Sequence, residues 1–485
     1  MDNKLFKKFV EFGVGNFIVL ITGFISSPII TRLILPEEFG KFSMFNTLTS
    51  LFIFILMVGL DQSYVRFFYE EDENLRGKLL VETVKLPIII NLILSIILII
   101  FYKPISSLII GKYSILLVLV IILQNTFNIL NKFSVLVVRM QQKGKTYSFL
   151  QVLGRVSYIL LIIMTFKVFN HDYKTLVFAT VISNIVVTII AVYIERKQWF
   201  QFNKPTKSLN TSKNEMIKFG IPLVFSMSIT WIFQSIDKFF VNAYNGYLEL
   251  GIYSAAFTIV AILVSVQESF VTFWVPIANE KYNEDPNNKK FFTKMNGIVS
   301  VVMLFIGIGI ILCKDIIVML LGQKYREASF IFPMLILMPI MFTISETTVI
   351  GINFKKKTKY HIITSIIAAV SNFIGNVILV PSLGAKGAAI STGLSYLIFF
   401  ATRTIISKRL YNVNYNLYSL CISVFSVIII ALYASFNKVN LVLITLSILV
   451  LFIVSISYRF IFVDLIKKLK ELKAGVIENE DINAR

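Results

Sequence analysis

The 485-residue sequence contains few of the residues on which most enzymes and metal proteins depend. It has two cysteines, two histidines and three tryptophans. Cys313 and Cys421 stand at the ends of separate hydrophobic runs, so neither a disulfide framework nor a cysteine metal site is predicted. The sequence also lacks a His-Glu metal motif, a Gly-x-Ser-x-Gly nucleophile turn and an Asp-x-Asp sugar-nucleotide motif. We therefore expect no cofactor, no metal and no enzymatic activity.

One phosphate-binding motif is only partly present. Gly144-Lys145-Thr146 resembles the end of a P-loop, but Arg139 stands where that pattern requires its first glycine. No strand is predicted before it, and the tripeptide lies in a turn between two apolar runs. ATP binding is therefore not expected there.

Charged residues are also scarce, at 15% of the chain, whereas hydrophobic residues make up 56% and the mean hydropathy is +0.78. Apolar runs of about 20 residues recur along the whole chain, which predicts an all-α integral membrane protein. We expect about fourteen transmembrane helices. Their predicted ranges are 9–33, 42–65, 79–101, 114–138, 147–167, 175–194, 216–241, 250–276, 292–313, 328–353, 360–381, 386–407, 417–436 and 440–462.

The net charge of +20 is explained by membrane orientation rather than by nucleic-acid binding. Most of the 47 Lys and Arg residues fall in the two termini and in the loops on one side of the predicted spans. The loop around Arg196 and Lys197 and the run Lys355–Lys357 are examples. Both termini are therefore predicted to be cytoplasmic, which agrees with an even number of spans.

The chain contains an internal repeat. Glu38-Phe39-Gly40-Lys41-Phe42-Ser43 corresponds to Glu249-Leu250-Gly251-Ile252-Tyr253-Ser254. The offset is 207 between Gly13 and Gly220, 211 between Gly40 and Gly251, and 213 between Tyr147 and Tyr360. Three matches in order, with a slowly drifting offset, predict two halves of similar topology related by an approximate two-fold axis.

These patterns divide the chain into five predicted parts. An N-terminal lobe of six helices spans residues 1–200, and a basic cytoplasmic linker follows at 201–215. A second six-helix lobe spans residues 216–410, two extra helices span 411–465, and a polar cytoplasmic tail ends the chain at 466–485.

Charged residues within the spans are the candidate functional residues, because each costs about 2.5–3.5 kcal/mol at the centre of a membrane helix. The cationic candidates, which suit an anionic guest, are Arg32, Arg66, Lys132, Arg155 and Lys238. The acidic candidates for ion coupling or ion pairs are Asp61, Asp237, Glu268 and Glu346.

Each group of candidates also has a purely structural interpretation. Arg32, Arg66 and Lys238 lie near span ends, where long side chains extend to lipid headgroups. Asp237 has basic neighbours with which it can pair, and the deeper charges can form ion pairs between helices.

Lys132 and Arg155 stand at similar distances from the turn that joins their two helices. At 1.5 Å per residue, both lie roughly 12–14 Å from that turn. The spacing therefore favours two cations at one depth in a hydrated cavity.

Three motifs resemble a known family: TRLILPEEFGKFS at 31–43, GLDQSYVRFFYEE at 59–71 and FGIPLVFSMSITWIFQSIDKFFV at 219–241. The chain resembles the Wzx-type polysaccharide biosynthesis flippases of the multidrug/oligosaccharidyl-lipid/polysaccharide (MOP) exporter superfamily. The resemblance covers nearly the whole chain. It implies a MATE-like fold of two six-helix lobes around a central cavity, with two additional C-terminal helices.

The resemblance also implies a function. A flippase of this kind moves an undecaprenyl-pyrophosphate-linked oligosaccharide from the inner to the outer leaflet of the bacterial cytoplasmic membrane by alternating access, for O-antigen, capsule or similar polysaccharide synthesis. The implied partners are the lipid-linked oligosaccharide, membrane lipids and a polysaccharide polymerase, with no nucleic acid.

Two alternatives remain open at the level of the sequence. A cation-coupled drug or small-molecule exporter of the same superfamily would favour acidic cavity residues, yet the first span has no acidic residue beyond Glu11 at its end. A membrane-embedded glycan polymerase usually needs a large external loop, whereas the longest predicted outer loops, near 103–112 and 314–326, are short.

Overall fold

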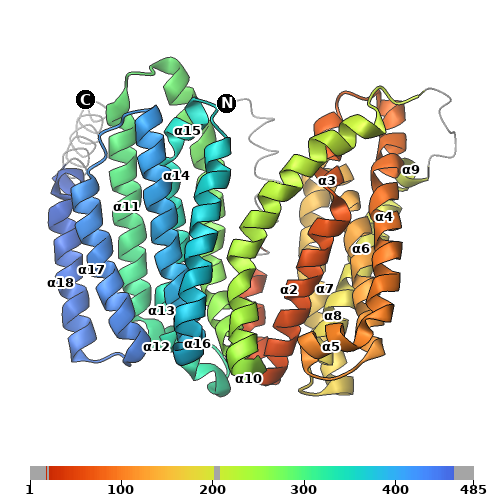
Figure 1. The fold of residues 1–485 in the computed structure, drawn as a ribbon, viewed down its shortest axis with the longest axis horizontal. Helices are drawn as coiled ribbons and strands as arrows, with labels where there is room; N and C mark the ends of the chain where they lie inside the picture. The colour runs from red at the N-terminus through yellow and green to blue at the C-terminus, as the bar shows by residue number, and fades with distance from the viewer. Residues whose placement is uncertain (1–17, 19–20, 201–207, 464–485) are drawn as a thin grey trace, which may run out of the picture. The chain divides into compact units, whose positions relative to one another are not determined.

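The computed structural model describes residues 18, 21–200 and 208–463. Within these residues the chain consists of helices joined by short connections, with no strand (Figure 1). A backbone in lipid has to satisfy its N–H and C=O groups internally, and helices do so within one segment. The predicted all-α class is confirmed. The predicted tail at 466–485 and residues 201–207 of the predicted linker lie outside the described residues.

The first half of the chain begins with a helix over residues 21–33 and continues into a series of longer helices. These are α2 (Pro36–Met57), α3 (Leu60–Phe67), η1 (Glu73–Leu75), α4 (Arg76–Ile100), α5 (Tyr102–Ile110), α6 (Ile115–Met140), α7 (Gly144–Phe169), α8 (Lys174–Ile194) and the short α9 (Arg196–Trp199).

The second half begins with the longest helix, α10 (Lys213–Glu284), and ends with the two additional helices that were predicted. Between and after them lie α11 (Lys289–Leu312), α12 (Lys314–Val318), η2 (Gln323–Phe330), α13 (Phe332–Leu335), α14 (Leu337–Thr348), α15 (Ile350–Phe354), α16 (Lys359–Leu410), α17 (Leu417–Phe436) and α18 (Leu441–Ser457).

Glycines divide the two longest helices into pairs of arms. Gly246 in α10 has φ 79° and Gly384 in α16 has φ 56°, both in the left-handed region that side chains disfavour. The chain reverses at each, so α10 consists of a first arm (213–245) and a second arm (247–284), and α16 likewise crosses twice.

The described helices account for the predicted spans. Nine are long and apolar enough to cross a membrane, and α10 and α16 each contribute a second crossing through their second arm. The bent pair η2 and α13–α14, the shorter apolar helix α18 and the helix that ends at residue 33 supply the rest of the fourteen.

The chain forms two compact units. Unit 1 comprises residues through Thr258 together with Leu321–Tyr325, and unit 2 comprises Ile259–Leu320 and the chain from Arg326 onward. Unit 1 has a core of aromatic and aliphatic side chains around Tyr64 and Phe133, contributed by α3, α4 and α6. Unit 2 has an aromatic core in which Trp274 and Tyr411 are buried.

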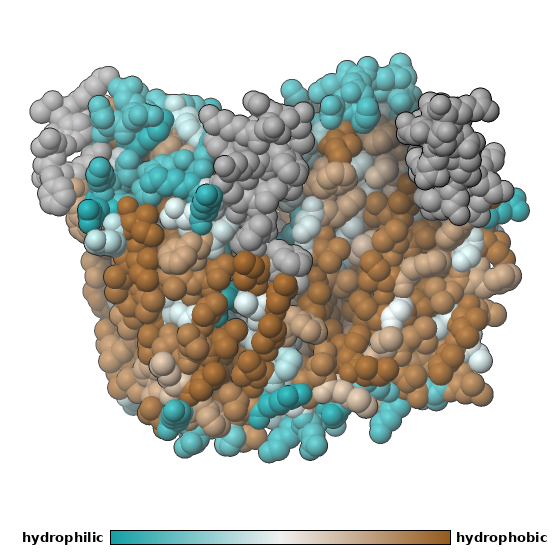
Figure 2. Space-filling model, turned by 180° about the vertical axis from the view of Figure 1, so that it is seen from behind, coloured by the Kyte–Doolittle hydropathy of each residue, from teal (hydrophilic) through white to brown (hydrophobic). Residues whose placement is uncertain are grey.

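Apolar side chains cover the sides of the helices, and hydrophilic residues gather at their ends (Figure 2). On α4, for example, Ile93, Ile96 and Ile100 are 55%, 61% and 67% exposed. Such exposure would be unfavourable in water but costs nothing against lipid tails. The helices therefore present the outward surface of a multi-pass membrane protein.

The described end of the predicted linker is held against the connection between α3 and η1. The buried carboxylate of Glu71 accepts hydrogen bonds from the backbone N–H groups of Asn210 and Thr211, at 3.1 and 2.9 Å. Ser212 and Glu215 then form a capping box at the start of α10, and the hydrogen bonds from Ser212 lower the pKa of the Glu215 carboxyl. The entry point of α10 is thus fixed within unit 1.

The two copies of the repeat motif pack directly against each other. We call this contact, between residues 36–43 and 247–254, the repeat seam. A methyl group at Gly40 would lie 1.9 Å from the carbonyl oxygen of Tyr247, and one at Gly251 would lie 1.7 Å from that of Pro36. These two contacts exchange under the 211-residue offset.

A hydrogen bond lies where the axis relating the two copies must pass. The hydroxyl groups of Ser43 and Ser254, which occupy the same position in the two copies, are 2.7 Å apart. Equivalent residues can meet in this way only close to the two-fold axis that relates them. The repeat predicted from the sequence is therefore confirmed as a structural relation.

Gly111 and Gly322 are a second pair of glycines separated by 211 residues, and each packs closely against a residue of the other half. No sequence match had indicated this pair. Gly111 lies against the ring of Tyr247, whose hydroxyl donates to the carbonyl of Ser107 at 3.0 Å. A methyl group added at Gly322 would lie 2.1 Å from the carbonyl oxygen of Thr31. The backbone N–H of Gly322 donates to the hydroxyl of the same threonine. Each half thus packs a turn onto the other half's copy of the motif.

The seam predicts a sharp difference between two glycine-to-alanine variants. Gly251→Ala should destabilise the protein, because a methyl there meets backbone that cannot move aside, and overpacking costs about 1–3 kcal/mol. Gly309→Ala in α11 should be neutral, because no atom lies within 4 Å of the added methyl. Thermal unfolding of the purified proteins in detergent measures both, and equal melting temperatures would contradict the tight seam.

Candidate functional site

Asp61 and Lys132, two of the predicted site residues, are brought together in unit 1. Left-handed conformations at Val58 and Gly59 end α2 and restart the chain as α3, which turns Asp61 toward α6. The Asp61 carboxylate is buried and lies 3.9 Å from the Nζ of Lys132. The Lys132 side chain is 49% exposed, so the pair has one buried acidic end and one accessible basic end.

Gly59 has a left-handed conformation and also packs closely against a neighbouring backbone. A methyl group on it would lie 2.3 Å from the carbonyl oxygen of Gly220 in the first arm of α10. The break between α2 and α3 therefore depends on two glycines far apart in the sequence, and it sets the direction in which Asp61 points.

Arg66, at the end of α3, forms an exposed ion pair with Glu70 and lies beside the ring of Phe67. Such an exposed pair is weak and can exchange with another anion. Arg66 is therefore a cation at the helix end rather than a buried one.

Arg32 and Arg155 differ from the other cations of unit 1 because they are exposed and have no acidic partner among the described residues. Arg155 lies on α7, one residue from Gly154, which packs against Val187 of α8. Because neighbouring helix positions point about 100° apart, Arg155 lies away from the packed face. It is an uncompensated guanidinium within a predicted span.

Asp237 and Lys238 lie in the first arm of α10. Asp237 is buried and accepts a hydrogen bond from the hydroxyl of Tyr253 at 2.8 Å. Lys238 is half-buried, with its Nζ 5.9 Å from the centre of the Phe257 ring. The two adjacent residues therefore contact different partners, and both partners lie in the second arm of α10.

Unit 2 contains a buried ion pair of which the sequence analysis predicted only one member, Glu346. Glu346 of α14 lies 2.9 Å from the Nη1 of Arg403 of α16, and both side chains are at most 8% exposed. The same nitrogen donates to the Ser345 hydroxyl at 2.6 Å. The Trp274 indole N–H donates to the Glu346 carbonyl at 3.0 Å.

Arg403 was not among the predicted residues. Its guanidinium also lies 4.7 Å from the Phe399 ring centre, so the cation is held by a carboxylate, a hydroxyl and an aromatic face. The only sequence signal was an arginine in an otherwise uncharged stretch of a predicted span. Its partner lies 57 residues away, and helix rotation, which hydropathy does not report, decides whether they meet.

Glu268, in the second arm of α10, is exposed and has no ion pair among the described residues. Its carbonyl accepts a hydrogen bond from the hydroxyl of Thr272, an ordinary contact within a helix. Of the four acidic candidates, Glu268 is thus the exposed carboxylate, whereas Asp61, Asp237 and Glu346 are buried and partnered.

The helices, their number and their internal charges define a multi-pass membrane protein. The structure is similar to that of the lipid II flippase MurJ in an inward closed conformation, with a TM-score of 0.70 at 17% identity over 93% of this chain and 100% of that chain. It is also similar to an inward-facing multidrug resistance MATE family transporter of the MOP superfamily, with a TM-score of 0.57 at 15% identity over 83% and 97% of the two chains.

The sequence comparison identifies the family. Residues 5–280 match the family of polysaccharide biosynthesis proteins, so the chain belongs to it. A relative, Lsg locus putative protein 1 of Haemophilus influenzae, is 21% identical over 356 residues, which are 71% of this chain and 82% of that protein. The predicted polysaccharide biosynthesis family is confirmed, and so is the predicted all-helical membrane fold.

The buried pair in unit 2 leads to a stability prediction. Arg403→Met should lower the free energy of unfolding by about 3–5 kcal/mol, because it leaves the Glu346 carboxylate buried and unpaired. Adding Glu346→Gln should restore most of that loss. Thermal unfolding in detergent measures the coupling between the two sites.

The exposed pair Lys281–Glu284 at the end of α10, with a distance of 2.6 Å, provides the control. Lys281→Met should leave the melting temperature unchanged, because exposed ion pairs contribute little. An Arg403→Met protein as stable as the wild type would refute the structural role of the buried pair.

Proposed function

We propose that this protein moves a lipid-linked oligosaccharide, carried on undecaprenyl pyrophosphate, from the inner to the outer leaflet of a bacterial cytoplasmic membrane by alternating access. Membership of the polysaccharide biosynthesis family supports a lipid-linked sugar as cargo. The fold shared with the lipid II flippase MurJ fits the same kind of transport. The polymer it would supply includes O-antigen, capsule or a similar surface polysaccharide, with a polymerase as the next partner.

The observation that carries the proposal is the excess of accessible cations in unit 1. Arg32 and Arg155 have no acidic partner among the described residues, and Lys132 keeps half of its side chain accessible while its pair with Asp61 is long. A pyrophosphate carries several negative charges and binds guanidinium groups through two parallel hydrogen bonds. Arg66 and Lys238 would extend this cationic path toward the helix ends.

The acidic residues favour an anionic guest over a cationic one. A cation-coupled drug exporter needs carboxylates that are free to bind its cargo, but Asp61 and Glu346 are compensated by Lys132 and Arg403. Glu268 remains as the candidate for ion coupling, because its carboxylate is exposed within a membrane helix. A polymerase is disfavoured because connections such as Gly111–Ser114 are too short to hold a catalytic loop.

The cationic path leads to a transport prediction. Arg155→Ala combined with Lys132→Ala should reduce polysaccharide export about ten- to hundred-fold, which corresponds to the loss of charged hydrogen bonds to the cargo. Arg155→Lys should retain part of the activity, since it keeps the charge but loses the two-pronged geometry. Complementation of a strain lacking this protein measures export, and immunoblots of membranes measure protein level.

Removing Lys132 also leaves Asp61 buried without its partner, so the stability effect has to be separated from the transport effect. Asp61→Asn with Lys132→Met removes both charges and should restore the protein level but not export. Lys167→Ala, at the exposed last turn of the Arg155 helix, is the matched control and should export normally. Normal export by the Arg155, Lys132 double variant would refute the cationic path.

Alternating access leads to a second prediction, because it requires the repeat seam to separate in each cycle. In a background with Cys313 and Cys421 replaced by serine, Ser43→Cys with Ser254→Cys places two thiols where hydroxyls now lie 2.7 Å apart. The resulting disulfide should stop export, and reduction should restore it.

A second serine pair provides the geometric control. Ser157 of α7 and Ser183 of α8 have hydroxyls 2.8 Å apart, but both belong to the same predicted lobe. A disulfide between cysteines at these two positions should leave export intact. Equal inhibition at both pairs, or export that continues through an oxidised seam, would mean that the seam does not open during transport.

A further inference from the structure

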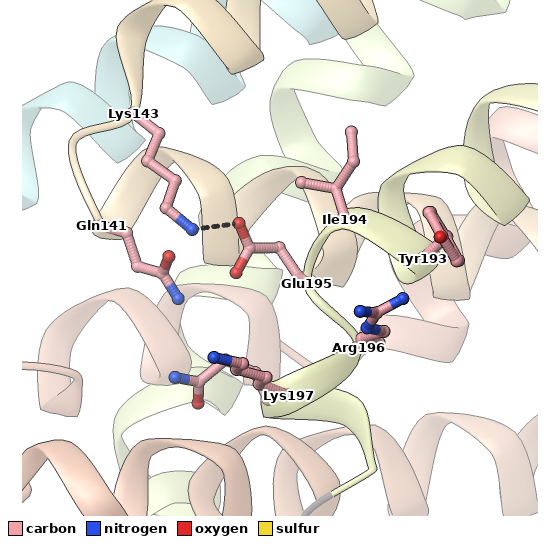
Figure 3. Close-up of a pocket in the computed structure, with 8 residues that line it drawn as sticks. Gln141, Lys143, Tyr193, Ile194, Glu195, Arg196 and Lys197 are labelled. Carbon is pink, nitrogen blue, oxygen red and sulfur yellow. Dashed lines mark hydrogen bonds and ion pairs between the residues drawn. The ribbon is translucent and has the colours of Figure 1, made fainter.

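A polar pocket lies at one end of unit 1, beside α9 and away from α5 (Figure 1, Figure 3). It has a volume of about 350 Å³ and opens at the surface. It forms where the α6–α7 turn meets the start of α9. The residues that shape it are Gln141, Lys143, Tyr193, Glu195, Arg196 and Lys197. By the predicted orientation, this end of the bundle faces the cytoplasm.

The pocket is held rigidly by a buried carboxylate. Glu195 is 3% exposed, and its carboxylate lies 2.6 Å from the Nζ of Lys143, as the dashed line in Figure 3 marks. The backbone carbonyl of Glu195 accepts the N–H groups of Gln198 and Trp199, which starts α9. Trp199 in turn packs against the unit 1 core. The wall that carries the cations is therefore anchored on both sides.

The pocket is lined by three basic side chains but only one acidic side chain. Glu195 compensates Lys143, but Arg196 and Lys197 have no acidic partner among the described residues. The guanidinium of Arg196 lies 5.0 Å from the centre of the Tyr193 ring, which orients it without cancelling its charge. The pocket thus offers a positioned guanidinium and an ammonium group to an anion.

The surroundings place this pocket at the level of lipid headgroups. Tyr193 and Phe200 on either side are 67% and 55% exposed, and Ile189 one turn earlier is 58% exposed. Exposed aliphatic residues mark the hydrocarbon region, and aromatic residues followed by Arg and Lys mark the interface. An anion that reaches this pocket therefore comes most readily from the membrane surface.

We propose that this pocket binds the phosphate group of an anionic phospholipid in the leaflet that it faces. Arg196 would hold two phosphate oxygens at once, and Lys197, whose side chain extends toward Gln141 rather than toward Arg196 (Figure 3), would act as a mobile point charge. Basic pockets between membrane helices on the cytoplasmic side suit this chemistry. The site is separate from the cationic residues assigned to transport, so it would tie α9 and the adjoining linker to the membrane rather than bind cargo.

The test uses the full-length protein purified in detergent, with lipid adducts measured by native mass spectrometry. Wild-type protein should retain phosphatidylglycerol in preference to phosphatidylcholine. The Arg196→Gln, Lys197→Gln double variant should bind phosphatidylglycerol about 30-fold more weakly, as expected for the loss of two basic residues at an anionic surface. Its circular dichroism and its melting temperature should match the wild type, because both side chains are exposed.

The matched control is Lys355→Gln with Lys356→Gln, an exposed dibasic pair after α15 on the same predicted side, which removes the same charge but does not line this pocket. It should change phosphatidylglycerol binding less than about twofold. Equal losses in the two double variants would show a diffuse basic surface and refute the pocket. Displacement of the adduct by millimolar inorganic phosphate, without preference between the two lipids, would assign the site to free phosphate and refute the lipid proposal.

Discussion

The close approach of two backbones at the repeat seam is the constraint on which the arrangement of unit 1 depends. Gly40 and Gly251 each leave no room for even a methyl group, and each faces a carbonyl oxygen of the other repeat. In lipid, where apolar surface gains little by being buried, such close contacts and a few hydrogen bonds hold helices together. The hydroxyl pair of Ser43 and Ser254 adds one such bond at the centre of the seam.

The seam also explains why the first arm of α10 belongs to unit 1, although it begins the second copy of the repeat. The Trp231 indole N–H donates to the hydroxyl of Ser50 at 3.0 Å, and the hydroxyls of Ser27 and Thr258 are 2.7 Å apart. These bonds join the opening helices of both halves. The compact units are defined by contacts within this one conformation, whereas the predicted lobes 1–200 and 216–410 are defined by the sequence repeat. The boundaries of the units and of the lobes therefore need not coincide.

Sequence patterns predicted most of the fold for physical reasons. Apolar runs of membrane length predict the number of helices. The motif around Gly40 and Gly251 revealed the repeat, because the seam needs glycine at the same place in both halves. The pairing of Asp61 with Lys132 was not predicted, because it depends on the turn at Gly59, which packs closely against Gly220 of another helix.

Arg403 of the unit 2 ion pair was not predicted for the same reason, because the sequence does not show which helices pack together. A charged residue in a span predicts that a partner or a wet surface exists, but it does not say which. Glu346 was selected as a buried acid, and its partner Arg403 emerged only when α14 and α16 were placed side by side. Arg155 was selected by the same reasoning but has no acidic partner in the part of the chain that the structure describes, so the pattern alone did not distinguish a structural charge from an unpaired one.

The two halves share the repeat motif but differ in the polarity of their side chains. Lys132 stands one residue from the repeat position of Glu346, at an offset of 213. In the first half the accessible end of the pair is the lysine, whereas in the second half both charges are buried. Backbone contacts at the seam have to remain symmetric for the two halves to meet, but side chains along the path are free to diverge. A scaffold joined by a symmetric seam can therefore place four of its five candidate cations in one half and its exposed carboxylate, Glu268, in the other.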